Sequence, residues 1–307
     1  MKTSLFCLAG ILTVIPLVRA GTDAADEASA RRVLREELVT AQSWGKVHAA
    51  DVLATYGEAA AVWPVFLREL KLHPDENQYR VGIHRVLART APTSAERAAE
   101  VAWIVRVFLD PTSRDRPHAI EALCKLGGPH DVAVISAARR WRAHATDADE
   151  VFISWLLWQS GDVSARDFVV SALHSSEAPA RLRAAYVLRM IGTKNPAALA
   201  ALVRAADLEP AGGDPTTRAM LVGAAYQLQA SPAQLVGWRE ILEKMVAEGP
   251  PLATYDALQA LMPSYGSANL ARLRPLLAAP AGDVRIAAAW AILDITTRAS
   301  AGPTTSR

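Results

Sequence analysis

Cysteine is nearly absent from this chain of 307 residues, which contains only Cys7 and Cys124. Cys7 lies in an apolar N-terminal segment, and Cys124 lies far along the chain among apolar positions. This composition excludes a disulfide framework, so burial of apolar side chains must hold the fold together. The chain can do this, because 51% of its residues are hydrophobic.

A surplus of charge of either sign is also missing. The chain has 33 basic residues of the Lys and Arg types and 31 acidic residues, which gives a formal net charge of +2. General nucleic-acid binders normally carry a basic surplus that neutralises phosphates. We therefore expect no nucleic-acid partner.

A long apolar run occurs only at the N-terminus. Lys2 precedes an apolar run from Leu5 to Val18, and Val18-Arg19-Ala20 places small residues where a signal peptidase cleaves. This pattern predicts a signal peptide over residues 1–20, which leaves a mature chain that is close to neutral and has one cysteine. No later segment is long enough to span a bilayer. We expect a bacterial protein exported to the periplasm or the extracellular space, and the alternative is an uncleaved membrane anchor.

What the chain does contain is an internal repeat. Helical segments with small residues ahead of a leucine or isoleucine return at intervals of 31 to 40 residues. The reference positions are Leu53, Leu87, Leu123, Leu157, Leu188, Leu228, Leu261 and Ile292. A period in this range, with two helices per unit, is typical of a helical solenoid.

The pattern predicts an all-α domain over residues 21–298, followed by a disordered tail over residues 299–307. About eight helix pairs are expected, at residues 27–56, 58–90, 94–126, 130–160, 162–191, 195–230, 232–264 and 267–298. Alanines at 49–50, 184–185 and 287–289 would let neighbouring helices approach closely. Asp283 is expected to cap the last helix, and Pro263 to end the helix before it.

Two segments carry a family resemblance. Ala180 to Gly192 and Val284 to Ile295 repeat a basic residue, an alanine pair and a later aliphatic residue, and Leu273-Arg274-Pro275-Leu276-Leu277 precedes the second segment. The sequence resembles HEAT repeats, in the short variant of phycobilisome-lyase-like HEAT proteins. The resemblance implies a right-handed α-α superhelix in which the second helix of each pair lines the concave face. It also implies a structural role for the basic residue that opens each second helix, namely Lys46, Arg80, Arg116, Arg181 and Arg285.

One face of these second helices is polar near the N-terminus and aromatic near the C-terminus. Positions five before, two before and two after each reference residue share that face, because steps of three and four residues return to one side of a helix. The candidate ligand-binding residues are Arg85, Arg89, His118, Glu121, Lys125, Trp155, Tyr186, Tyr226 and Trp290. We expect a partly anionic or hydroxyl-rich ligand over the arginines, because two guanidiniums this close need a counter-charge and Glu121 offsets only one. The alternative is that the polar residues are solvated and the aromatic residues fill space between helices.

Residues suited to catalysis or metal binding do not form a recognisable set. His48 and His118 occupy equivalent positions two repeats apart, too far for one ion, and the chain has no His-Glu dipeptide. It also lacks a Gly-x-Ser-x-Gly motif and a phosphate-binding glycine loop. Asp51 and Glu121 are expected to be solvated. The sequence therefore predicts no enzyme, no metal and no cofactor.

The resulting expectation is a monomeric, non-catalytic binding or scaffolding protein. Its partner would be a protein, a peptide or a glycan bound on the concave face, with no membrane span after signal cleavage. Two alternatives stay open. The first is an accessory module that docks on a secreted enzyme or membrane transporter through its convex helices or its ends, and the second is a solenoid enzyme.

Overall fold

The computed structural model describes residues 15–75, 77–128, 131–210, 212–228 and 232–301 of the chain. These residues form sixteen α-helices that pack in sequential pairs, which confirms the predicted all-α array of helix pairs. Part of the predicted signal peptide, residues 1–14, and the predicted tail from residue 302 lie outside the described residues. Among the helices of the described part, none combines the length and apolarity needed to cross a bilayer.

The even-numbered helices form an inner layer. They are α2 (Trp44–Thr55), α4 (Asn77–Thr90), α6 (Arg116–Lys125), α8 (Asp147–Gln159), α10 (Ala178–Ile191), α12 (Pro215–Leu228), α14 (Pro251–Leu261) and α16 (Gly282–Ser300). Each inner helix contacts the next one, and α16 contacts α2, so the inner layer closes into a ring.

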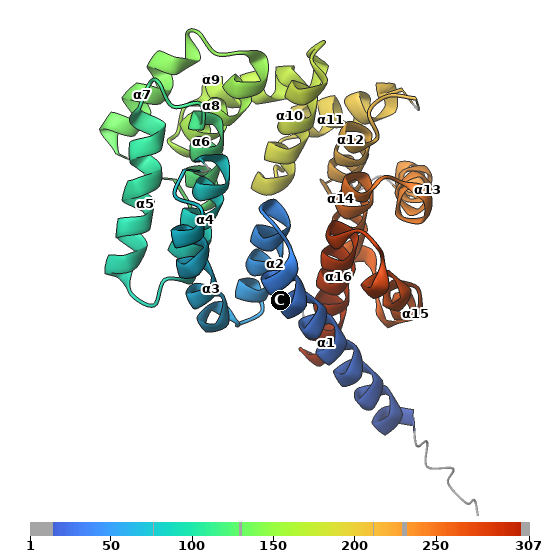
Figure 1. Ribbon diagram of the computed structural model, residues 1–307. Coiled ribbons are helices and arrows are strands. Elements are labelled where there is room, and N and C mark those ends of the chain that lie inside the picture. Colours follow the sequence, from blue (N-terminus) through green and yellow to red (C-terminus); the bar gives the residue numbers. More distant parts are fainter. Residues whose placement is uncertain (1–14, 76, 129–130, 211, 229–231, 302–307) are drawn as a thin grey trace, which may run out of the picture.

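The odd-numbered helices lie outside this ring, as Figure 1 shows for α5 beside α4 and α13 beside α14. They are α1 (Ile15–Thr40), α3 (Ala59–Leu72), α5 (Ser94–Leu109), α7 (Val132–Arg142), α9 (Val163–Ser171), α11 (Pro196–Leu208), α13 (Pro232–Glu248) and α15 (Leu270–Leu273). The predicted signal-peptide cleavage point, after Ala20, falls inside α1.

Small residues bring the inner helices together, as the alanine pattern predicted. Ala49, Ala50, Ala184, Ala185 and Ala287 are at most 2% exposed. Gly223 of α12 goes further, because a Cβ atom there would lie 2.8 Å from the Cβ atom of Ala260 on α14. These close approaches leave no room for larger side chains between the helices.

The basic residue that opens an inner helix ties consecutive units together. Arg181 donates hydrogen bonds to the backbone carbonyls of Ser175 and Ser176, and it forms an ion pair with Glu209 at the end of α11. Lys46 of α2 pairs at 2.6 Å with Glu69 of α3 in the same way. Arg80 and Arg285 also donate to carbonyls of the turn before their helices, and Arg116 donates to the carbonyl of Phe108 in the last turn of α5. The structural role implied for these residues is confirmed.

The two ends of the array meet through the same kind of contact. Arg285 of α16 pairs with Glu37 of α1 at 2.5 Å. The helix α1 therefore packs against α16 as the next outer helix, just as α3 packs against α2. Arg274 binds Asp26 of α1 with two hydrogen bonds, of 2.7 and 2.9 Å. Glu37 and Asp26 are 4% and 7% exposed, which marks this contact as part of the core. The spacing of the repeats gave no indication of this closure.

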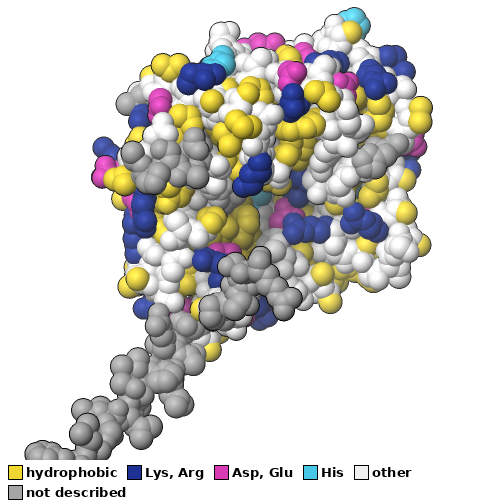
Figure 2. Space-filling model, turned by 180° about the vertical axis from the view of Figure 1, so that it is seen from behind, with side chains coloured by type: hydrophobic (Ala, Val, Ile, Leu, Met, Phe, Trp, Pro, Cys, Tyr) yellow, Lys and Arg dark blue, Asp and Glu magenta, His cyan; other side chains and the backbone are white. Residues whose placement is uncertain are grey.

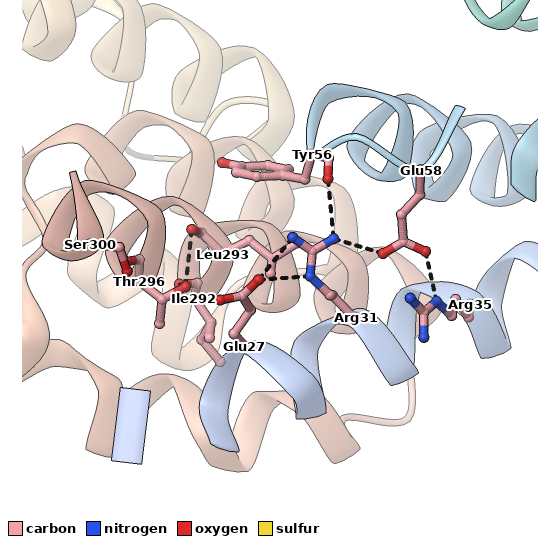
Figure 3. Close-up of polar contacts among 9 residues, drawn as sticks. All are labelled: Glu27, Arg31, Arg35, Tyr56, Glu58, Ile292, Leu293, Thr296 and Ser300. Atoms are coloured by element: carbon pink, nitrogen blue, oxygen red, sulfur yellow. Dashed lines mark hydrogen bonds and ion pairs between the residues drawn. The ribbon is translucent and has the colours of Figure 1, made fainter. Parts of the chain in front are cut away.

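On its other side, α1 is attached to the beginning of the array. Arg31 donates to the carbonyl oxygen of Tyr56 at 3.2 Å and to Glu58 at 2.7 Å, and Arg35 binds the second oxygen of Glu58 (Figure 3). The C-terminal part of α16, with Thr296 and Ser300, lies beside the same stretch of α1 in that view. The first helix therefore bridges the beginning and the end of the chain.

Two local expectations for the last repeat were wrong. The outer helix expected in the first half of the last pair, residues 267–298, is interrupted, because Pro275 lacks an amide hydrogen. It consists of α15 followed by a 3-10 segment, Arg274–Ala278. Asp283 does not cap α16, because the helix already begins at Gly282 and the capping position is Ala281. The carboxylate of Asp283 is therefore available for contacts inside the ring. As expected, α14 ends at Leu261, just before Pro263.

The closing contact can be tested with two adjacent glutamates of α1. Glu37→Gln removes the buried charge that Arg285 binds, so we expect the free energy of unfolding to fall by about 2 kcal/mol. Glu36→Gln is the matched control, because Glu36 and its partner Arg32 have side chains that are 57% and 64% exposed, and such pairs contribute under about 0.5 kcal/mol. Urea unfolding of both variants measures the difference, and equal effects would contradict a buried closing contact.

The close packing of the inner helices can be tested with two glycines. Gly223→Ala forces α12 away from α14, and we expect it to destabilise the fold by about 1–3 kcal/mol. Gly237 lies in α13 with no atom within 4 Å of an added Cβ atom. Gly237→Ala should therefore stabilise the fold by about 0.5–1 kcal/mol through helix propensity alone. A stabilising Gly223→Ala substitution in thermal unfolding would show that the two helices are further apart.

Candidate functional site

Polar side chains from six inner helices meet at the centre of the ring. Asp51 of α2 lies within electrostatic reach of Lys125 of α6 and Tyr255 of α14, and Arg85 of α4 lies within reach of Tyr186 of α10. These helices are not neighbours in the ring, so the contacts pass across its interior. The face predicted from the repeat register therefore points inward, and closure of the ring brings its members together.

Asp51 pairs with both of the predicted arginines. Its carboxylate accepts a hydrogen bond of 2.8 Å from Arg85 and one of 3.2 Å from Arg89, and Arg89 also donates to the hydroxyl of Thr55. Burial by itself would raise the pKa of Asp51, but Arg85 and Arg89 outweigh it and hold that pKa below its usual value. Asp51 thus supplies the counter-charge that was expected from a ligand, and it is not the freely solvated carboxylate that was predicted.

Glu121, Lys125 and Tyr186 form the adjoining part of the site. Lys125 pairs with Glu121 at 2.7 Å, and its ammonium group lies 5.3 Å from the centre of the Tyr186 ring. Burial works against both charges, but each ion stabilises the other, so the pKa of Lys125 is raised and that of Glu121 is lowered. Together with Asp51, Arg85 and Arg89 these three residues make up what we call the Asp51 cluster.

The aromatic residues of the predicted face are packed against the core. Trp155 is 2% exposed, and its ring centre lies 6.0 Å from that of Tyr186 in an edge-to-face contact. Tyr226 and Trp290 are half-buried and also pack against the core. These residues stabilise the wall of the ring, in agreement with the alternative interpretation that the aromatic residues fill space between helices. Tyr186 alone among them touches the charged residues.

His118 lies within electrostatic reach of Glu121 and Lys125 of the Asp51 cluster, and its ring packs against an aromatic partner two repeats away. Its ring centre is 5.6 Å from that of Trp44 at the start of α2. Gly82 of α4 makes this approach possible, because a Cβ atom there would lie 3.1 Å from the Trp44 ring. Burial lowers the pKa of His118, which favours the neutral imidazole near neutral pH.

A second group of residues at the centre was not among the predicted site residues, although one member, His48, occupies the position equivalent to His118. Asp256 of α14 faces Arg189 of α10 at 3.7 Å, and His48 of α2 lies 3.6 Å from Asp283 of α16 and stacks on Tyr255 at 5.0 Å. Burial raises the pKa of Asp256 to about 6, and Arg189 and His48 offset only part of that shift. We call these five residues the Asp256 cluster. Arg189 lies three residues after Tyr186, so the helical spacing alone could have placed it on the same face.

The central residues keep part of their surface accessible although helices surround them. The side chains of Asp51, Glu121 and Lys125 are 21%, 20% and 25% exposed. Figure 2 shows one face of the molecule hollowed near its middle, where acidic and basic side chains gather. A hollow lined with fixed donors and acceptors can hold a small polar molecule.

The described residues contain no group of three or more His, Cys, Asp and Glu side chains arranged to hold a metal ion. Cys124 is buried among core residues, and burial raises the pKa of its thiol well above the usual value, so it is a poor nucleophile. The residues of the Asp51 and Asp256 clusters offer a ligand hydrogen bonds, ion pairs and contacts with aromatic rings.

No known protein family matches this sequence, and no curated protein is similar enough to count as a relative.

The role of Asp51 predicts a pH-dependent stability. Asp51→Asn leaves Arg85 without its counter-charge, so at pH 7 we expect a loss of about 2–3 kcal/mol in the free energy of unfolding. The pKa of Asp51 is lowered from 3.8 on folding, so its contribution is complete above pH 4 and disappears as the pH falls through the lowered value. Urea unfolding between pH 7 and pH 3 measures this.

Asp294→Asn is the control for this substitution, because Asp294 pairs with Arg298, whose side chain is 47% exposed. We expect it to cost under about 0.5 kcal/mol at any pH. The assignment of Asp51 as the central counter-ion would be wrong if Asp51→Asn were equally mild.

Proposed function

We propose that this chain is a non-catalytic HEAT-type binding protein that holds its ligand at the centre of the ring. In this proposal the helix pairs are HEAT repeats of a right-handed α-α superhelix whose last turn packs against its first. Support comes from the recurring basic residue that ties α4, α10 and α16 to the preceding turn, and from the buried alanines of the inner helices. The protein acts after export, in the periplasm or the extracellular space, as the N-terminal signal sequence predicts.

The observation that carries the proposal is the charged hollow of the ring. Stability alone does not call for ions there, because apolar residues of similar volume hold a core together at least as well as buried ion pairs do. Charged and aromatic side chains that six separate helices bring to one hollow are instead typical of a binding site. Asp51 fixes the two arginines before any ligand arrives, so little ordering cost remains for binding.

Binding is favoured over catalysis by the state of the carboxylates in the Asp51 cluster. The pKa values of Asp51 and Glu121 are both held below their usual range by neighbouring cations. A carboxylate that is ionised and already paired is a poor proton donor, and its basicity is reduced. The same cations can still donate further hydrogen bonds to a ligand.

Docking through the outer helices is the second candidate, and one feature favours it. A surface pocket of about 670 Å³ lies between α5 and α6, with Ala98, Val101 and Leu123 among its apolar lining residues. A partner protein could insert an apolar side chain there. Docking through free ends of the array is not favoured, because α1 and α16 pack against each other.

Native mass spectrometry of the protein purified without unfolding from its own host tests both candidates. We expect a bound small molecule, and titration of that compound should show weaker binding to Tyr186→Ala by at least about 1 kcal/mol. Ala98→Arg, which fills the outer pocket, should leave that binding unchanged. If the compound binds Tyr186→Ala as tightly as wild type, or if Ala98→Arg alone abolishes binding, the site is not at the centre of the ring.

A further inference from the structure

The pair of Arg189 and Asp256 is unusually loose for two buried ions. Arg189 Nη2 lies 3.7 Å from Asp256 Oδ1, and the two side chains are only 9% and 12% exposed. Arg189 Nη1 is fully buried and has no hydrogen-bond partner among the described residues. Elsewhere in the chain buried carboxylates meet arginine closely, as in the two bonds of 2.7 and 2.9 Å between Arg274 and Asp26. A guanidinium has five N–H donors, so this pair leaves most of its bonding capacity unused.

The contact between His48 and Asp283, two other members of the Asp256 cluster, is also long. His48 Nδ1 lies 3.6 Å from Asp283 and makes no hydrogen bond within the described part of the chain. The side chains of His48 and Asp283 are 28% and 29% exposed, which is more than the values for Arg189 and Asp256. Exposure thus falls from the α2 and α16 side of the cluster towards α10 and α14. This arrangement leaves an unsatisfied donor, Arg189 Nη1, at the buried end and the carboxylate of Asp283 at the more accessible side.

We infer that the Asp256 cluster binds a small zwitterion of the amino-acid type, with its carboxylate on Arg189 and its ammonium group between Asp256 and Asp283. This inference rests on the proposed function, because it names the ligand of the same hollow. A carboxylate can take two donors of a guanidinium at once, and an ammonium group carries three donors for the aspartates. Tyr255 and His48, stacked at 5.0 Å, form a flat wall beside the ligand.

The balance of charge selects this class over simpler ions. The cluster holds two carboxylates and one guanidinium, and His48 adds a positive charge only when it is protonated. A lone anion on Arg189 would therefore meet two negative neighbours. A lone cation would satisfy the aspartates and leave Arg189 with its free donors. A zwitterion adds no net charge and supplies a partner of opposite sign to each group. The long distance of 3.7 Å between Arg189 and Asp256 agrees with this view, as does burial, which raises the pKa of Asp256 by more than Arg189 lowers it.

Thermal shift and calorimetry of the full chain with the twenty L-amino acids test the inference. Acetate, methylammonium and glucose serve as probes that carry only the carboxylate, only the ammonium group, or neutral hydroxyls. We expect at least one amino acid to bind and to raise the unfolding temperature, while the three partial probes bind at least about tenfold more weakly. The inferred ligand class is wrong if none of the twenty amino acids binds, or if glucose binds more tightly than any amino acid.

Substitutions then locate the site. Arg189→Gln and Asp256→Asn should each weaken the amino acid by about tenfold or more, since each removes one charged partner. Asp283→Asn, at a more exposed position, gives the same readout if the buried variants fail to fold. The control is Arg183→Gln, because Arg183 also belongs to α10 but is already paired with Asp149 at 2.8 Å. Unchanged affinity in Arg189→Gln or Asp283→Asn overturns the assignment.

The two proposals fail in different ways. If binding of a co-purified compound is weakened by Tyr186→Ala while no amino acid binds, the ring still binds a ligand but the inferred ligand class is wrong. If an amino acid binds and neither Tyr186→Ala nor Arg189→Gln affects it, binding at the centre of the ring is wrong as well.

Discussion

The ion pair of Glu37 and Arg285 joins the first outer helix to the last inner helix, and the arrangement of the whole chain depends on that contact. It repeats a contact found within the array, where Lys46 pairs with Glu69 and Arg181 with Glu209. In each case a basic residue near the start of an inner helix binds a carboxylate of the next outer helix. Because Glu37 of α1 lies in that position, the last inner helix, α16, packs against the first outer helix, α1.

Closure explains why the centre of the ring is polar and why its ions pair across repeats. In an open array, the inner face of each helix would meet solvent and its nearest neighbours only. In the ring, Asp51 also lies within electrostatic reach of Lys125, two inner helices away. His48 stacks on Tyr255, which lies far away in the sequence. Charges that would be solvated on an open concave face are thereby partly desolvated, which makes their pairing strong enough to shift their pKa values.

Much of this structure could be predicted from the sequence, because it follows from local periodicity. The helix pairs, the buried alanines and the inward face carrying Arg85 and Tyr186 all depend on spacings within one repeat. Closure could not be predicted, since the curvature of the array is a sum over eight packed units that no single spacing encodes. Asp256, five residues before the reference residue Leu261, shares the predicted face, but its pairing with Arg189 depends on contacts between α14 and α10 that no spacing within one repeat encodes. Burial of the aromatic residues was predicted only as an alternative, because the contact of Trp155 with Tyr186 on another helix depends on the packing between repeats.

Hydrogen exchange across the native chain, with and without Arg285→Ala, tests the closed ring most directly. Nearest-neighbour coupling confines damage to adjoining units of a repeat array. In a ring, α1 adjoins α16, so the substitution should speed exchange in α1 as well as in α14 and α16, although α1 lies about 250 residues away in sequence. Faster exchange in α14 to α16 with unchanged protection of α1 would show that the array is open.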